Sequence, residues 1–287
     1  MESDPIFFLH FPRTAGTTID KIFSLNLSPE NIIHIYSKDE YNKYSTIEIE
    51  KFQNIKYITG HLLLEKLNPT TFYGQKVRAF TILRNPAKRL FSEYNFLKTW
   101  KNQHLYNFLN SNNISFSEYI TSKDKLLFYR GKNFMTRCLS GDSLEKTNDL
   151  TASLEKAKYN LLNTFWFYGL QERFMESLLL LAEKAKLNNI LHQRHNALKL
   201  HNENSKLTDN ELEILYEYNR ADIELYKFAE ERFDALIKSR GKIFQQTLKN
   251  FTFLNTKFQK LAGILYNHAY QNENSNQKIQ LSKETKW

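Results

Sequence analysis

A chain of 287 residues with a formal net charge of +9 is long enough to bury one large core or two modest ones. Its 41% hydrophobic and 14% aromatic content excludes a disordered chain. No stretch approaches the roughly 20 apolar residues of a membrane span, and the first apolar run, 6–11, is too short for a signal peptide. We therefore expect a soluble, cytoplasmic protein.

Apolar runs and turn residues predict strands that alternate with helices. The clearest buried strand lies in 76–86 and ends at Asn85 and Pro86, where a helix can begin. Short buried strands between helices favour an α/β fold with a central, mainly parallel sheet flanked by helices. In chain order we predict strands at 5–11, 55–60, 76–86 and 164–170, and helices at 16–25, 87–100, 172–187 and 208–240.

The composition changes after Gly241. Residues 244–270 carry Phe and Leu in an amphipathic pattern, and 271–287 are polar and expected to fray. We divide the chain into a domain at 1–240 and a helical extension with a polar tail at 241–287. The apolar stripe of 244–270 is expected to pack on the domain or on a second copy of the chain, and a role at a membrane surface is the alternative.

The stretch FLHFPRTAGTTI, residues 8–19, places a turn of small and hydroxylated residues between a strand and a helix. Backbone N–H groups at such a helix start attract anions, and the threonine hydroxyls add donors. Arg13 adds a fixed positive charge. We predict a phosphate or sulfate site here; the alternative is an ordinary connection capped by Thr17 or Thr18. The stretch lacks the first glycine and the lysine of a Walker A loop.

A second anion site is predicted around TILRNPAKRLFSEY. Arg84 follows a buried strand, and Ser92 lies eight residues later on the next helix, so the two can converge on an anion separate from the first. Alternatively, Arg84 only marks the strand's end and Arg89 is a solvated helix residue. Two anion sites without a magnesium signature indicate a nucleotide that carries phosphate at two separate positions.

Other candidate sites are weaker. Cys138 is the only cysteine, which fits a reducing compartment, and it is expected to be a buried hydrophobic residue. His192, His195 and His201 lie near one another in sequence, but no Cys or acidic cluster completes a metal site, so we expect no metal. Basic and acidic residues are interleaved without a dense basic stripe, so nucleic-acid binding is not predicted.

The two anion motifs together resemble the phosphosulfate loop and the 3′-phosphate motif of the sulfotransferases that use 3′-phosphoadenosine 5′-phosphosulfate (PAPS). The chain is most similar to the carbohydrate branch, which includes the heparan sulfate 2-O- and 6-O-sulfotransferases and their bacterial relatives. The resemblance spans about 5–235. It extends to GH at 60–61, NFMTRCLSG at 133–141, FYGLQERFMESLLLL at 167–181 and NRADIELYKFAEERF at 219–233.

The resemblance implies a role for each matched residue. His61 corresponds to the general base that deprotonates the acceptor hydroxyl, and Arg13 stands where the family usually has lysine. Asn133 and Arg137 match a motif at the edge of the cleft and are assigned to substrate or cofactor contact. The 5′-phosphosulfate would be bound by Arg13, Thr14, Ala15, Gly16, Thr17 and Thr18, and the 3′-phosphate by Arg84 and Ser92.

The sequence as a whole predicts a PAPS-dependent sulfotransferase of P-loop-like α/β fold. It would transfer a sulfuryl group to a hydroxyl, on a sugar or glycoconjugate, and release adenosine 3′,5′-bisphosphate (PAP). The alternatives are a nucleotide-dependent kinase on the same fold and a non-catalytic polyanion-binding protein. Residues 26–55 and 98–130 are expected to select the acceptor, whose identity the sequence does not reveal.

Overall fold

The computed structural model describes residues 4–36, 40, 53–61, 71–72, 75–128, 130–142, 149–193 and 207–284. Its centre is a five-stranded parallel sheet with the strand order β2-β3-β1-β6-β7. A separate antiparallel pair, β4 (Thr71–Phe72) and β5 (Gln75–Lys76), lies outside this sheet. The predicted α/β fold with a parallel sheet is confirmed. The strands of the main sheet are β1 (Ile6–Leu9), β2 (Ile32–Ile35), β3 (Tyr57–Gly60), β6 (Arg78–Leu83) and β7 (Phe167–Leu170).

The central strands are continuous apolar runs because the sheet is covered on both faces. Every residue of β1 is buried, and so is all of β6 after Arg78. Such runs are typical of parallel strands between helical layers. The edge strand β2 differs, since its His34 is exposed. The sequence predicts no strand in this partly polar segment.

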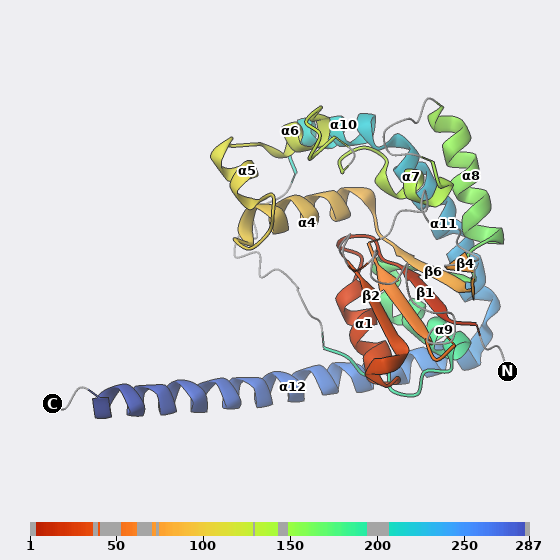
Figure 1. Cartoon of the computed structure of the whole chain (residues 1–287). Coiled ribbons are helices and arrows are strands. Elements are labelled where there is room, and N and C mark those ends of the chain that lie inside the picture. The colour runs from red at the N-terminus through yellow and green to blue at the C-terminus, as the bar shows by residue number, and fades with distance from the viewer. Residues whose placement is uncertain are drawn as a thin grey trace.

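Helices surround the sheet, and a further group of helices forms a lobe beside it (Figure 1). Helix α9 packs along β7, and α7, α8 and α11 pack against one another. Helices α4, α5, α6 and α10 build a lobe with its own apolar cluster around Leu90, Leu109 and Tyr119. The helices are α1 (Gly16–Ser24), α4 (Pro86–Thr99), α5 (Tyr106–Ser111), α6 (Phe116–Thr121), α7 (Phe134–Ser140), α8 (Leu150–Asn163), α9 (Phe174–Ala185), α10 (Asp209–Tyr218), α11 (Arg220–Ser239) and α12 (Gly241–Glu284), with short 3-10 turns at Pro29–Asn31 and Gln171–Arg173.

The prediction of one helix over 208–240 is wrong, because the chain bends at Asn219 and forms α10 and α11. Asn219 is fully buried; its side-chain amide donates to the carbonyl of Gly131 at 2.7 Å and accepts from the N–H of Asn133 at 3.0 Å. Periodicity alone could not show this break, since no proline or glycine marks it. At this bend, Asn219 connects the helical lobe to the residues that precede α7.

Helix α12 runs far past the rest of the molecule in Figure 1 and is helical to Glu284, so the expected fraying of 271–287 is not seen in the backbone that is described. Its first turns belong to the main core through Phe244 and Phe251. Asn255 is also buried and accepts from the N–H of His192 at 2.9 Å. The boundary at residue 240 stays a prediction, and the beginning of the extension packs on α9.

This packing leads to a stability prediction. Replacing Phe244 and Phe251 together by alanine should lower the free energy of unfolding by about 3–6 kcal/mol, since two buried aromatic side chains lose their burial. The matched control replaces Ile243 and Phe253, both exposed neighbours on the same helix, and should change it by less than about 1 kcal/mol. Urea unfolding of both variants tests this; equal losses of the free energy of unfolding would contradict the packing.

A chain that ends after residue 270 should have the same free energy of unfolding as the full chain.

Candidate active site

The carboxyl ends of all five parallel strands open into one cavity of about 1140 Å³. In open α/β sheets this edge is where ligands bind. The first residue after each strand lines the cavity, so five side chains form a row along this edge of the sheet. In sheet order these residues are Tyr36, His61, His10, Arg84 and Gln171.

The predicted phosphate loop forms the turn between β1 and α1. Arg13 and Ala15 both have left-handed backbone, with φ of 68° and 65°. Helix α1 begins at Gly16 without a side-chain cap and without an acidic residue in its first turn, whereas α10 has a complete capping box from Thr208 and Glu211. An uncapped helix start is a favourable place for an anion.

The side chains of this loop have different tasks. Pro12, Arg13, Ala15, Gly16, Thr17 and Thr18 line the cavity, and all of them except Pro12 belong to the predicted phosphosulfate loop. Thr14 does not line it: its fully buried hydroxyl donates to the carbonyl of Phe11 at 2.8 Å and holds the turn. Its side chain therefore shapes the loop.

Gly16 is required by a close approach. A Cβ atom at this position would lie 1.8 Å from Nε2 of His10, whose imidazole ring packs over the start of α1. Any side chain here would displace either the histidine or the loop. The absence of a side chain at Gly16 and the position of the His10 ring therefore depend on each other at the end of β1.

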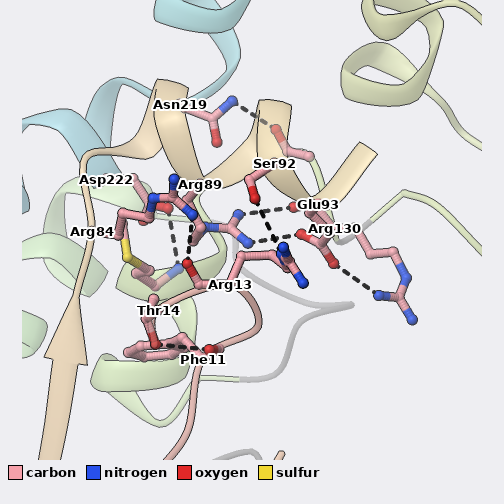
Figure 2. Close-up of polar contacts among 12 residues, drawn as sticks. Phe11, Arg13, Thr14, Arg84, Arg89, Ser92, Glu93, Arg130, Asn219 and Asp222 are labelled. Carbon is pink, nitrogen blue, oxygen red and sulfur yellow. Dashed lines mark hydrogen bonds and ion pairs between the residues drawn. The ribbon is translucent and has the colours of Figure 1, made fainter. Parts of the chain in front are cut away.

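The two predicted anion motifs meet in the structure, as Figure 2 shows. Arg84 donates from its guanidinium to the carbonyl of Arg13 at 2.7 Å, and Arg13 Nε donates to Ser92 Oγ at 3.1 Å. The Arg13 guanidinium also lies 4.6 Å above the ring of Phe96. The sequence predicts two anion sites for one nucleotide, and in the structure the residues of both motifs line one cavity.

His61 is placed at the end of β3, close to the phosphate loop. Its Nδ1 lies 2.8 Å from the carbonyl oxygen of His10, and since a carbonyl only accepts, Nδ1 carries the proton. In the neutral ring Nε2 is then the nitrogen with the free electron pair. Desolvation by the surrounding protein lowers the pKa of His61 below its ordinary value, so the ring is neutral at physiological pH.

His10 was not identified from the sequence, although it directly precedes the phosphate loop. Its ring lies 4.5 Å from that of His61 between centroids, and burial lowers its pKa well below the ordinary value, with further effects of His61 and Arg13. Tyr36 packs edge-on against His61 at 4.9 Å and donates to Asp20 of α1 at 2.5 Å. These contacts hold the two imidazoles beside the loop.

Glu172, just after β7, is a second residue that sequence analysis missed. Its carboxylate accepts from the N–H of Asn85 at 3.2 Å and from the hydroxyl of Tyr226 at 2.8 Å. It also opposes the lowering of the Arg84 pKa that burial causes. His10 is the first residue after β1 and Glu172 the second after β7, and the rule that ligands bind at the carboxyl ends of parallel strands could have identified both.

A buried charge network borders the cavity on the side of α4 (Figure 2). Arg89 is fully buried, so its alternative reading as a solvated residue is wrong; it pairs with Glu93 at 2.8 Å. Glu93 also pairs with Arg130 at 3.0 Å. Arg130, Gln103 and His104 line the cavity and come from the stretch 98–130 that was expected to select the acceptor.

Asn133 and Arg137 do not line this cavity. Asn133 is buried and has left-handed backbone; its amide donates to the carbonyl of Tyr218 at 2.8 Å and accepts from the N–H of Asp222 at 3.1 Å. Asp222 accepts in turn from the first amides of α7. The structure gives Asn133 a role in joining α7 to α11, and its contact with a substrate stays a prediction, as does that of Arg137.

His192 and Cys138, the candidate metal and thiol residues that the structure describes, are both buried. No group of three potential metal ligands occurs in the described part of the chain. His192 is buried and bonded to Asn255 and to the carbonyl of Ile190, while His195 and His201 lie outside the described residues. Burial raises the pKa of the Cys138 thiol, which makes it a poor nucleophile.

The molecule is an α/β protein with a parallel sheet. The cavity at the strand ends is lined by the uncapped start of α1, by Arg13 and Arg84, and by His61. A family model described as the sulfotransferase family matches residues 1–229. The chain belongs to the sulfotransferase family.

Other comparisons are more distant. The chain is similar to a solved structure of the mouse sulfotransferase SULT7A1 complexed with PAP, with 12% identity and a TM-score of 0.38. The similarity covers 76% of this chain and 64% of that chain, so it spans less than two thirds of the mouse protein's solved length. No curated protein matches the sequence.

Proposed function

We propose that this protein transfers a sulfuryl group from PAPS to a hydroxyl group of a sugar or glycoconjugate. One observation carries the proposal: the two anion-binding motifs of β1 and β6 and the histidine after β3 line the same cavity. The membership in the sulfotransferase family supports the type of reaction. The carbohydrate acceptor rests on the resemblance of the motifs to the carbohydrate branch.

The donor set of the cavity fits a nucleotide with phosphates at two positions. The uncapped start of α1 and Arg13 would bind the 5′-phosphosulfate, and Arg84 with Ser92 would bind the 3′-phosphate. Arginine suits this task because its planar guanidinium can bind two oxygens of a phosphate at once. The bond between Arg84 and the Arg13 carbonyl would keep the two binding elements in register.

His61 would act as the general base. As the acceptor oxygen forms its bond to sulfur, the bond between sulfur and the bridging oxygen of the 5′-phosphate breaks, and Nε2 takes the hydroxyl proton. The His10 carbonyl supports this role because it binds the Nδ1 proton and so leaves Nε2 unprotonated. The lowered pKa of His61 keeps the base available at neutral pH.

The charge that develops on the departing PAP would be stabilised by Arg13 and the start of α1. Arginine does not give up a proton at physiological pH, so Arg13 would act by its charge and its hydrogen bonds. Arg130 and His104 also line the cavity and would face the acceptor. Arg130 is paired with Glu93, and desolvation and Arg130 lower the pKa of His104, so these residues would contact the acceptor mainly through hydrogen bonds.

A thermal-shift panel separates this function from its alternatives. PAP should raise the melting temperature in the absence of metal, and ATP with Mg²⁺ should raise it much less. A response to ATP with Mg²⁺ alone would support a kinase, and a response to heparin without one to PAP would support a polyanion-binding protein. Labelled PAPS with a panel of hydroxylated acceptors would then identify the acceptor.

The role of Arg84 is tested by comparing two nucleotides that differ in one group. PAP should bind more tightly than adenosine 5′-monophosphate, which lacks the 3′-phosphate. In Arg84→Ala the affinity for PAP should fall roughly ten- to hundredfold, since a charge-assisted hydrogen bond contributes about 1.5–3 kcal/mol. The affinity for the monophosphate should fall by a smaller factor, since it loses only the support that Arg84 gives to the loop through the Arg13 carbonyl. Arg220→Ala, at an exposed arginine far along the chain, is the control. Calorimetry that finds equal losses for both nucleotides would contradict the assignment.

A further inference from the structure

Helix α12 has two apolar faces, and the rest of the chain covers only one of them. Phe244, Phe251 and Asn255 are buried against the body. At about 100° per residue, Ile243, Leu254, Leu261 and Leu265 fall within roughly 40° of one another, about a quarter turn from this buried face. These four side chains are between 56% and 85% exposed. We call them the outer stripe; exposed apolar side chains that gather on one side of a helix mark an interaction site.

The charges beside the outer stripe are all positive. Between Gly241 and Leu265 the helix has four exposed lysines, and the sequence has no Asp or Glu there. Lys242, Lys249 and Lys260 fall in a single row on the helix, at the edge where the exposed Phe253 and Ile264 border the outer stripe. A basic row beside an apolar stripe is typical of helices that lie in the interface of an anionic lipid bilayer. We call these three residues the lysine row.

A second copy of the chain fits this surface less well. Between Gly241 and Leu265, a second α12 would bring the same lysines and no acidic residue, so these parts of the two helices would repel each other. Helix α12 projects well beyond the body (Figure 1), and the four side chains of the outer stripe are exposed. Among the residues that the structure describes, no helix is long and apolar enough to cross a bilayer. The surface therefore suits a helix that lies on a membrane.

We propose that α12 binds the surface of an anionic lipid bilayer. The outer stripe would enter the boundary between headgroups and acyl chains, and the lysine row would contact the phosphate headgroups. This inference does not depend on the proposed sulfuryl transfer, because the cavity and the outer stripe use different faces and different residues.

The test uses the full chain with vesicles of phosphatidylcholine, with and without phosphatidylglycerol, in a co-sedimentation assay. We expect binding to the anionic vesicles that weakens as salt is added, and little binding to phosphatidylcholine alone. Changing Leu254, Leu261 and Leu265 to glutamine should lower the partition coefficient at least about tenfold, and so should changing the lysine row to glutamine. Since all six side chains are exposed, both variants should fold, and thermal unfolding checks this.

Matched controls have the same chemistry elsewhere on the surface. One changes the exposed Leu126, Leu162 and Leu236 to glutamine, and the other changes the exposed Lys101, Lys125 and Lys227 to glutamine; both should bind like the wild type. Absence of vesicle binding by the wild type, or equal binding by all variants, would overturn the proposal. So would a dimer, seen by analytical ultracentrifugation, that the leucine variant abolishes while vesicles have no effect, because the stripe would then bind a second copy.

Discussion

His61→Ala is expected to reduce the turnover of labelled PAPS by about 10²–10⁴-fold, which is the usual contribution of a general base, while the affinity for PAP stays within about twofold. The reason lies in the placement of the side chain. His61 follows β3, whereas the anion-binding residues follow β1 and β6, so removing the imidazole takes no charge from the phosphate sites.

The matched variant His61→Asn separates chemistry from structure. An asparagine amide can still donate to the His10 carbonyl in place of Nδ1, but it offers no basic nitrogen. If His61 is the base, the asparagine variant should be as inactive as the alanine variant. Recovery of turnover by asparagine, or loss of PAP binding in parallel with turnover, would instead indicate a structural histidine.

The pH profile provides a second readout of the same residue. The neutral ring accepts the proton, so kcat/KM should rise as the pH increases through the pKa of His61 and level off above it. Burial lowers this pKa below the ordinary value of 6.5, so the rise should lie on the acidic side of that value. The acidic limb should disappear from the residual activity of both variants.

Arg13→Ala is expected to reduce kcat/KM on the order of a hundredfold or more, comparable to the loss of one donor that stabilises charge in a transition state. The side chain contacts Ser92 and Phe96 inside the cavity, while the main-chain carbonyl binds Arg84. Because the carbonyl remains in the variant, the position of Arg84 should be kept and the loss should come from the missing guanidinium.

Two further variants sharpen this expectation. Arg13→Lys restores the residue that the family usually has and should keep substantial activity, since lysine still supplies the charge. Ser92→Ala removes the neutral partner of Arg13 and should weaken PAP binding without a comparable effect on kcat. Steady-state kinetics with labelled PAPS checks all three, and near-wild-type turnover of Arg13→Ala would show that its charge does not act on the sulfate.

Much of the fold could be predicted because its buried strands are continuous apolar runs in the sequence. The predicted strand in 76–86 contains β6, and the predicted helix at 16–25 coincides with α1 within one residue. A buried parallel strand needs apolar residues on both faces, so its pattern does not depend on its neighbours. The edge strand β2 was missed because His34 faces solvent and breaks such a run.

Side chains that act over long distances in the sequence could not be predicted. The break at Asn219 depends on Gly131 and Asn133, which lie more than 80 residues earlier. The fragments 133–141 and 219–233 of the family resemblance contact each other through the same pairing. Solvation of Arg89 was the alternative reading; the side chain is buried and donates to the carbonyl of Arg130, 41 residues later, at 3.3 Å.

The sequence by itself determined the residue types of the site: a turn of small residues before a helix, an arginine after a buried strand, and a histidine after another. Local geometry carries this information, since a strand, a turn and the start of a helix are built by neighbouring residues. Only the tertiary structure decided that these elements meet. The parallel order of the strands brings Tyr36, His61, His10, Arg84 and Gln171 to one edge, because parallel strands all end on the same side of a sheet.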